Sequence, residues 1–376
     1  MRVQPNTALI KNNYLSSMID RVSKIIKPAI LAAKAYHVPD SNGLIKLDAM
    51  ENPYCWPEEV KTEWSKCLYQ AELNRYPDAS LSELRNRLTQ TLHLPDETAM
   101  MFGNGSDELI QIILMALNKT SNVVMAPEPS FVMYRLLSSM MELDFVGVPL
   151  NNDFSLNLAA MLEAIETKQP AVIFIAWPNN PTGNAFEQED LEEIIKVAPG
   201  LVVIDEAYHA FAQKSMMSCL NKYPNVLLMR TLSKLGLAGL RLGMLFGASE
   251  WISELDKLRL PYNIGTLNQL SANFIINNIS LLEQQAEQIR KDRADVFASL
   301  TGIAGVEAWE SEANFILFRV AEAGADKVHQ ELIKQKILIK NLHGALPLLE
   351  NCLRVTVGTA EENNKFLSAL NSILNS

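Results

Sequence analysis

Seven short apolar segments alternate with segments of helical periodicity through the middle of the chain, between residues 98 and 248. Several of the apolar segments are apolar at consecutive positions, which is typical of strands buried on both faces of a sheet. The segments 107–117, 158–165 and 191–197 place apolar residues three and four positions apart, as helices that cover a sheet do. The alternation predicts an α/β domain with a mostly parallel, seven-stranded sheet. Its strands are expected at 98–103, 122–126, 145–150, 171–177, 201–204, 226–230 and 243–247.

A second, smaller domain follows Pro261, where the pattern changes. A long stretch of helical periodicity, at about 266–300, predicts a helix that links the two domains. Segments 314–320, 337–340 and 352–357 predict strands, and 325–334 and 361–374 predict helices, which together are typical of an α+β domain. We expect an N-terminal segment (1–74) that contributes to the small domain, a large domain (75–265) and a C-terminal small domain (266–376). The charged face of the linking helix is predicted to carry Glu283, Glu287, Arg290, Lys291 and Arg293.

Composition excludes several classes of protein. Lys and Arg number 33 against 43 Asp and Glu, so the formal net charge of -10 disfavours a nucleic-acid-binding protein. The first residues lack the features of a signal peptide, and no apolar run approaches about 18 residues, so we expect neither export nor membrane insertion. The five histidines show no metal-ligand spacing. The cysteines have no CxxC spacing and favour a reducing cytoplasm; they are Cys55, Cys67, Cys219 and Cys352.

Polar residues follow several of the predicted strands, at the edge where open α/β sheets bind ligands. Gly-Asn-Gly-Ser at 103–106 opens a helix, Asn-Asn-Pro-Thr-Gly at 179–183 and Asp-Glu-Ala-Tyr at 205–208 follow strands, and so does Thr-Leu-Ser-Lys at 231–234. Each motif alone has an ordinary structural interpretation, such as a turn, a capped helix or a solvated lysine. Their common position indicates a single ligand site.

The order of these motifs resembles that of the fold-type I pyridoxal-phosphate aminotransferases over nearly the whole chain. Within that superfamily, four longer words resemble the histidinol-phosphate aminotransferase family. They are Leu-Asp-Ala-Met-Glu-Asn-Pro-Tyr at 47–54, Arg-Tyr-Pro-Asp at 75–78, Thr-Leu-Ser-Lys at 231–234 and Cys-Leu-Arg-Val-Thr-Val-Gly-Thr at 352–359.

The resemblance implies catalytic roles for Lys234, Asp205 and Tyr208 with the cofactor pyridoxal 5'-phosphate. Lys234 would form the internal aldimine and then, as a free amine, move a proton at the substrate carbon, which an always-protonated arginine could not do. Asp205 would pair with the protonated ring nitrogen. Tyr208 and Asn180 would contact the phenolic oxygen of the cofactor, and Phe131 would stack on its ring or, alternatively, be a core residue.

The resemblance also implies a phosphate site and a homodimer. Tyr76 would reach the phosphate of the neighbouring subunit, and the segment 1–74 would contribute to dimer contacts. Lys234 and Arg241 are seven positions apart, one fewer than is common in the family, and the intervening glycines could absorb the difference. The phosphate ligands within one chain would be Ser106, Asp107, Thr231, Ser233 and Arg241, at a helix N-terminus.

Four residues are implied in substrate binding. Arg354 would bind both the substrate phosphate and the carboxylate of the glutamate co-substrate. Lys340 stands where the family often has a second arginine, and it would bind phosphate as a point charge. Tyr36 and Asn52 match substrate-contacting positions of the family's N-terminal segment.

The implied activity is transamination of L-histidinol phosphate with 2-oxoglutarate in histidine biosynthesis, through two half-reactions. An aromatic or broad-specificity aminotransferase and a threonine-phosphate decarboxylase of the same fold are alternatives. A regulator that keeps the fold without turnover would need an appended DNA-binding domain. The roughly 45 residues before the first family word are too short and too weakly basic for one.

Overall fold

The computed structural model describes residues 20–35, 38–118 and 120–375 and contains two sheets. The larger has the order β2-β8-β7-β6-β5-β3-β4, and β8 alone runs antiparallel to its neighbours, β2 and β7. The expectation of a mostly parallel, seven-stranded sheet is therefore confirmed. Its strands are β2 (Ala99–Asn104), β3 (Val123–Glu128), β4 (Asp144–Pro149), β5 (Val172–Ala176), β6 (Leu201–Asp205), β7 (Val226–Thr231) and β8 (Leu242–Gly247).

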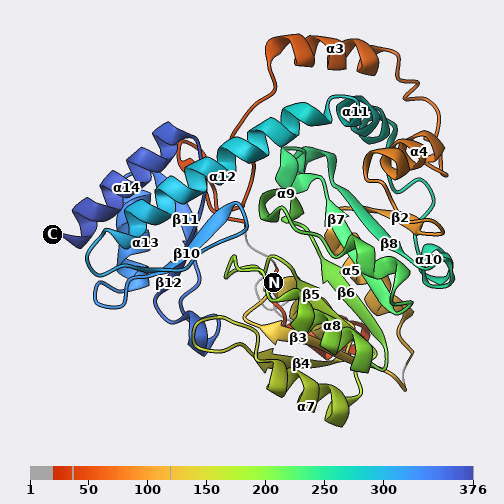
Figure 1. Ribbon diagram of the computed structural model, residues 1–376, viewed down its shortest axis with the longest axis horizontal. Coiled ribbons are helices and arrows are strands. Elements are labelled where there is room, and N and C mark those ends of the chain that lie inside the picture. Colours follow the sequence, from red (N-terminus) through yellow and green to blue (C-terminus); the bar gives the residue numbers. More distant parts are fainter. Residues whose placement is uncertain (1–19, 36–37, 119, 376) are drawn as a thin grey trace, which may run out of the picture.

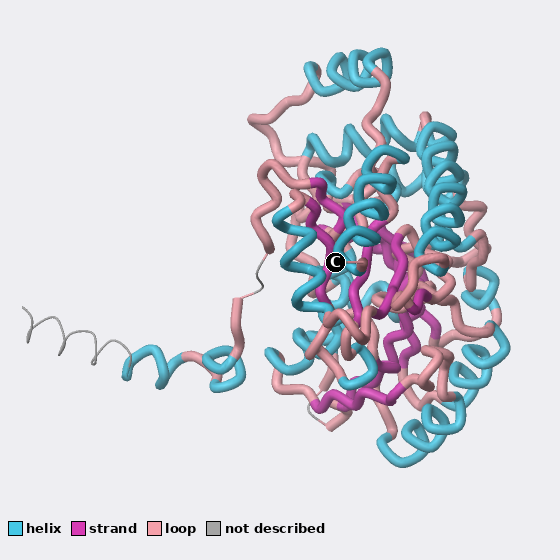
Figure 2. The backbone as a smooth tube through the Cα atoms, turned by 90° about the vertical axis from the view of Figure 1, so that its left-hand side faces the viewer, coloured by secondary structure: helices cyan, strands magenta, loops and turns pink. Residues whose placement is uncertain are grey.

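Helices cover both faces of this sheet, and strands occupy the interior in Figure 2. Successive side chains of a strand point to opposite faces, so Val203 packs into one apolar cluster and Ile204 into the other. This arrangement explains why the strand segments are apolar at consecutive positions. One face is covered by α5 (Ser106–Ala116), α6 (Val132–Met140) and α10 (Ser249–Asp256), and the other by α4 (Ser82–Thr91), α7 (Leu158–Lys168), α8 (Gln188–Val197), α9 (His209–Ala212) and α11 (Thr266–Ile276).

The smaller sheet has the order β1-β11-β12-β10-β9. Ile45–Leu47 forms β1 and pairs in parallel with β11, so the N-terminal segment joins this sheet, as expected; the exact domain limits stay predictions. Helices α13 (Ala325–Lys334) and α14 (Ala360–Leu374) pack on it with the end of α12 (Ile279–Thr301). The other strands are β9 (Glu307–Ala308), β10 (Phe315–Arg319), β11 (Ile337–Asn341) and β12 (Cys352–Thr356).

The predicted linking helix is two helices, which corrects the sequence-based expectation. The structure ends α11 at Ile276 and begins α12 at Ile279, with Asn277 and Asn278 between them. From there α12 runs to the smaller sheet (Figure 1). Arg290 and Arg293, expected on its charged face, are partly buried and donate to the carbonyls of Ala210 and Ala313, both at 2.8 Å.

The remaining elements are short or peripheral. Two 3₁₀ turns, Ser233–Leu235 and Ala238–Leu240, follow β7 and form part of the site described below. Among the described residues, no helix has the length and apolar character that crossing a bilayer requires. The other elements are α2 (Pro28–Ala32), α3 (Glu58–Tyr69) and 3₁₀ turns at Met217–Asn221 and Pro347–Leu349.

Candidate active site

The polar residues that follow the strands of the larger sheet surround one cavity. It lies beside the ends of β5, β6 and β7 and the N-terminus of α5. Every residue predicted to bind the cofactor, except Tyr76, lines it. The lining residues are Met50, Ser106, Asp107, Phe131, Ala176, Asn180, Asp205, Ala207, Tyr208, Thr231, Ser233, Lys234 and Arg241.

A buried carboxyl group lies at one end of the cavity. Asp205 is the last residue of β6, and its two oxygens accept hydrogen bonds from Tyr134 Oη (2.7 Å) and the Ala207 backbone N–H (3.1 Å). Burial raises the pKa of the Asp205 carboxyl to about 6, although these hydrogen bonds favour its ionised form. A cation that entered this end of the cavity would restore the charged carboxylate.

A chain of side chains joins this end of the cavity to the smaller sheet. Asn180 donates to Tyr208 Oη at 3.1 Å and accepts from Arg354 of β12 at 2.5 Å. Arg354 also donates to the Asp48 carbonyl at 3.0 Å. Burial raises the pKa of Tyr208 well above its usual value, so its phenol stays protonated and is able to donate a hydrogen bond.

Lys234 lies in the 3₁₀ turn that follows β7, with its Nζ 3.3 Å from the Ala49 carbonyl. Burial, and then the positive charge of Arg354, lower the pKa of Lys234 to about 8. A larger fraction of this amine is therefore neutral and nucleophilic near pH 7 than of a solvated lysine.

The opposite end of the cavity is suited to an anion. Helix α5 begins at Ser106, and the hydroxyl oxygens of Thr231 and Ser233 lie 2.9 Å apart nearby. Arg241 Nη2 lies 3.4 Å from the Asp107 carboxylate, and these two side chains are 46% and 45% exposed. Backbone N–H groups, hydroxyls and a guanidinium together form the kind of donor set that binds phosphate.

Two glycines allow these groups to approach one another. Gly105 has φ +87°, and a Cβ there would lie 2.5 Å from Arg241 Nη2. A Cβ at Gly243 would lie 2.7 Å from the Ser106 nitrogen. Between Lys234 and Arg241 the chain forms two 3₁₀ turns joined by Gly236 and Leu237, and Gly236 has φ +110°, a conformation that favours glycine.

Other predicted site residues lie away from this cavity. Tyr76 is 80% exposed and stacks on Tyr262, with ring centroids 4.5 Å apart. Asn52 donates to the Leu235 carbonyl (3.1 Å) and to Gln285 (2.9 Å), so its amide contacts the lysine-bearing turn and α12. Lys340 lies opposite Arg354 in the pairing of β11 with β12. Burial, and then the positive charge of Arg354, lower the pKa of Lys340. Tyr36 lies outside the described residues.

Sequence reasoning missed two residues of the site. Tyr134, which donates a hydrogen bond to Asp205, matches the apolar periodicity of its helix. A tyrosine at a buried helix position needs a polar partner for its hydroxyl, and this need is the one sequence signal that points to its role. Met50 lines the cavity with a left-handed backbone (φ 52°), held by Thr356 Oγ1 and the Asn314 amide, both at 3.0 Å. No local pattern predicts such contacts across the fold.

Comparison with known proteins identifies the family of the chain. The family model described as "Aminotransferase class I and II" matches residues 42–370, so the chain belongs to this pyridoxal-phosphate-dependent family. Histidinol-phosphate aminotransferase 2 of Nitrosococcus oceani is 51% identical over 93% of this chain and 98% of its own. Histidinol-phosphate aminotransferase 2 of Cupriavidus pinatubonensis is 46% identical over 93% and 96%. Within the class, these relatives place the chain in the histidinol-phosphate aminotransferase family.

A solved structure supports the fold independently. Histidinol-phosphate aminotransferase from Sinorhizobium meliloti, in complex with pyridoxal-5'-phosphate, superposes with a TM-score of 0.83 at 20% identity. The match covers 93% of this chain and 98% of that one. The fold is therefore that of the fold-type I aminotransferases.

The cavity residues fit the family's cofactor. A ring-nitrogen cation matches the buried carboxyl of Asp205, whose pKa burial raises to about 6. A phosphate matches the donors at α5, where Gly105 leaves room for Arg241. The amine of Lys234, whose pKa burial lowers to about 8, lies in the same cavity. The chain thus has a complementary group for each charged part of pyridoxal phosphate.

Proposed function

We propose that this protein transfers the amino group of L-histidinol phosphate to 2-oxoglutarate, giving 3-(imidazol-4-yl)-2-oxopropyl phosphate and L-glutamate. The observation that carries the proposal is the 51% identity to a histidinol-phosphate aminotransferase over 93% of the chain. The cavity supports it, because Lys234, Asp205 and Asn180 line it and Asn180 is hydrogen-bonded to Arg354. We place the enzyme in the cytoplasm, because its cysteines carry no disulfide pattern.

Pyridoxal phosphate supplies an electron sink that stabilises negative charge at the substrate carbon. Lys234 Nζ takes the proton from the carbon that bears the substrate amine, and later returns a proton, because its lowered pKa makes both forms accessible. Asp205 would keep the cofactor ring nitrogen protonated. Tyr208 and Asn180, which are hydrogen-bonded to each other, would donate to the cofactor's phenolic oxygen.

The two substrates share a site through their anionic groups. Arg354 binds the phosphate of one and the carboxylate of the other, and Lys340, beside it on β11, adds a second positive charge. Of the residues that line the cavity, Ser106, Asp107, Thr231, Ser233 and Arg241 would hold the cofactor phosphate, and Phe131 would pack on the ring. The direct roles of Tyr36 and Asn52 at the substrate remain predictions from the family.

The protein acts as a homodimer in this proposal. Tyr76 projects from its own chain and would complete the phosphate site of the second subunit. The Tyr76 ring is exposed and stacks on Tyr262. Two adjacent aromatic side chains at the surface support the proposal that a second subunit covers this part of the chain.

A single-turnover titration tests the proposed reaction. Cofactor-loaded protein is mixed with L-histidinol phosphate alone, and we expect the visible absorbance of the cofactor to fall with one equivalent of ketone formed per site. Subsequent 2-oxoglutarate restores the absorbance. Conversion only by aromatic amino acids, or carbon dioxide release from threonine phosphate, would instead identify one of the two alternative activities.

A further inference from the structure

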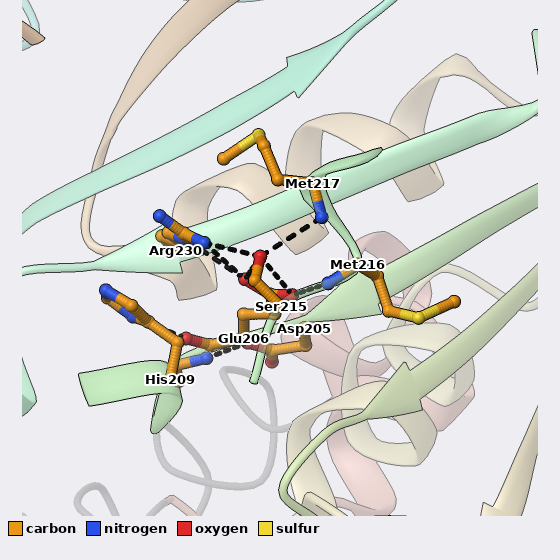
Figure 3. Close-up of polar contacts among 8 residues, drawn as sticks. Asp205, Glu206, His209, Ser215, Met216, Met217 and Arg230 are labelled. Atoms are coloured by element: carbon orange, nitrogen blue, oxygen red, sulfur yellow. Dashed lines mark hydrogen bonds and ion pairs between the residues drawn. The ribbon is translucent and has the colours of Figure 1, made fainter. Parts of the chain in front are cut away.

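Glu206 and Arg230 form a buried ion pair (Figure 3). The Glu206 side chain is 0% exposed and that of Arg230 is 7% exposed. Glu206 Oε2 accepts hydrogen bonds from Arg230 Nε (2.9 Å) and Nη2 (2.7 Å), and Oε1 accepts from the Met216 backbone N–H (2.6 Å). Ser215 Oγ lies 2.7 Å from Arg230 Nη2 and 3.0 Å from both carboxylate oxygens. The pair is therefore extensively hydrogen-bonded.

Each member of the pair is the chain neighbour of a residue that lines the cavity. Glu206 follows Asp205 at the end of β6, and Arg230 precedes Thr231 in β7. The Glu206 backbone N–H also donates to Met229 of β7 at 2.8 Å. Because alternate side chains point to opposite faces, the ion pair joins the two strand ends from the face opposite Asp205 and Thr231. A displacement of either charged side chain would thus move a cavity residue.

Close packing alone does not hold these strand ends. A second cavity lies on the same side, lined in part by His209, Arg230, Leu232 and Leu235. Leu232 precedes the turn that carries Lys234, and Leu235 ends it. Side chains that border a cavity lose packing contacts on that side. The directional bonds between Glu206 and Arg230 supply the constraint that packing does not.

Stability alone is a weak reason for such a pair. Desolvation of two buried charges offsets most of their attraction, and well-packed uncharged replacements are often equally stable. His209 adds no charge, since burial and then Arg230 lower its pKa to about 3. What the pair provides is a defined geometry at the ends of β6 and β7.

We propose that Glu206 and Arg230 are positioning residues for the cofactor: their ion pair sets the Asp205 carboxyl and the Thr231 hydroxyl at the spacing that the ring nitrogen and phosphate require. The inference rests on the roles proposed above for Asp205 and Thr231. It adds two residues that touch neither cofactor nor substrate and act through their chain neighbours.

The double variant Glu206→Gln/Arg230→Met tests this role. It removes both charges together, so no unpaired buried charge remains, and the amide oxygen introduced at position 206 is still able to accept from the Met216 backbone N–H. We expect a urea midpoint close to that of the parent. The dissociation constant for pyridoxal phosphate should rise about tenfold or more, as is typical when supporting residues are removed. The circular dichroism of the bound cofactor's visible band should also change.

A matched control separates positioning from general stability. Arg319 is a partly buried arginine that donates to the carbonyls of Leu348 and Glu350 beside the smaller sheet. Arg319→Met should lower the urea midpoint and leave the cofactor's affinity and visible band unchanged. Unchanged affinity and an unchanged visible band in the double variant would overturn the inference.

Two further variants keep the test decisive. If the double variant does not fold, Arg230→Lys keeps the charge but loses the two-nitrogen contact, and it should still weaken cofactor binding; parental affinity in this variant would overturn the inference. Asp205→Asn serves as the reference for the proposed site. If Asp205→Asn binds the cofactor with parental affinity, the proposed role of Asp205 is wrong and this inference is wrong with it. If Asp205→Asn binds the cofactor weakly while the ion-pair variants bind it with parental affinity, only the role of the ion pair is contradicted.

Discussion

The two ends of the active-site cavity differ in how completely a single chain builds them. At the ring end, Asp205, Tyr134 and Tyr208 are buried and hydrogen-bonded within one subunit. At the phosphate end, the Arg241 and Asp107 side chains are each about half exposed. The ring end is thus enclosed by the fold, while the phosphate end stays open to the cofactor and, in the homodimer proposed above, to a second subunit.

This difference has an energetic side. Burial disfavours the charged forms of Asp205 and Lys234, shifting their pKa values toward neutrality, whereas exposed charges at the phosphate end keep most of their hydration. We therefore expect substitutions at the ring end to lower the rate of transamination most, and substitutions at the phosphate end mainly to weaken cofactor binding.

Lys234→Ala should cause the largest loss at the ring end. It removes both the covalent attachment and the amine that moves the proton, so we expect transamination to fall by at least about 10⁴-fold. Lys234→Arg should be equally inactive, because a guanidinium does not give up its proton. Steady-state assays with L-histidinol phosphate measure the effect, and appreciable activity in either variant would refute the site assignment.

Asp205→Asn should reduce kcat by about 10²- to 10³-fold, the usual cost of losing a group that stabilises charge in a transition state. The amide keeps the shape: its oxygen is able to accept from the Ala207 N–H and its NH2 to donate to Tyr134 Oη, so the main change is the loss of the negative charge. Rapid-quench measurement of the first half-reaction isolates this step. A kcat within a few-fold of the parent would contradict the proposed ring-nitrogen contact.

Arg241→Ala should weaken pyridoxal phosphate binding by about 10- to 100-fold, the range expected for hydrogen bonds to a charged group. Arg241→Lys keeps the charge without the fork and should lie between the alanine variant and the parent. Equilibrium dialysis of the cofactor gives both dissociation constants. If the alanine variant retains parental affinity, the assignment of the phosphate end is wrong.

Tyr76→Phe should have the smallest effect on binding, about fivefold, corresponding to one hydrogen bond contributed by a second subunit. Tyr262→Phe provides a matched control, because its ring stacks on Tyr76 but its hydroxyl has no predicted role. The same dialysis experiment compares the two. Equal affinities for the two variants would argue against a composite site.

The sequence predicts the larger sheet well, because strands buried on both faces leave an unmistakable apolar run, as at Val202, Val203 and Ile204. It also predicts which residues line the cavity, because the ends of parallel strands meet at one edge. The break between α11 and α12 was not predicted, since helical periodicity continues across Asn277 and Asn278.

Contacts between segments distant in sequence could not be predicted. The three-residue strand β1 is too short to carry a pattern and is stabilised by β11, almost 300 residues away. Arg290 and Arg293 were assigned to a charged face because nothing local indicates that backbone carbonyls near α9 and β10 would accept from them. Likewise, Tyr134 and Asp205 meet only when α6 packs on the sheet.

The contrast between the two ends rests on the buried carboxyl of Asp205, and its effect on stability is directly measurable. A carboxyl whose pKa is raised from 3.8 to about 6 contributes fully to stability below its unfolded pKa, and that contribution is lost as the pH rises through 6. Ionised Asp205 should therefore destabilise the cofactor-free protein by about 3 kcal/mol at pH 8, since each pKa unit corresponds to about 1.4 kcal/mol.

Urea unfolding of the cofactor-free parent and Asp205→Asn, at pH 5 and pH 8, tests this most directly. We predict that the variant is more stable than the parent by about 3 kcal/mol at pH 8, and by about half as much at pH 5. Saturating pyridoxal phosphate should stabilise the parent more than the variant. A variant that is less stable than the cofactor-free parent at both pH values would contradict the account.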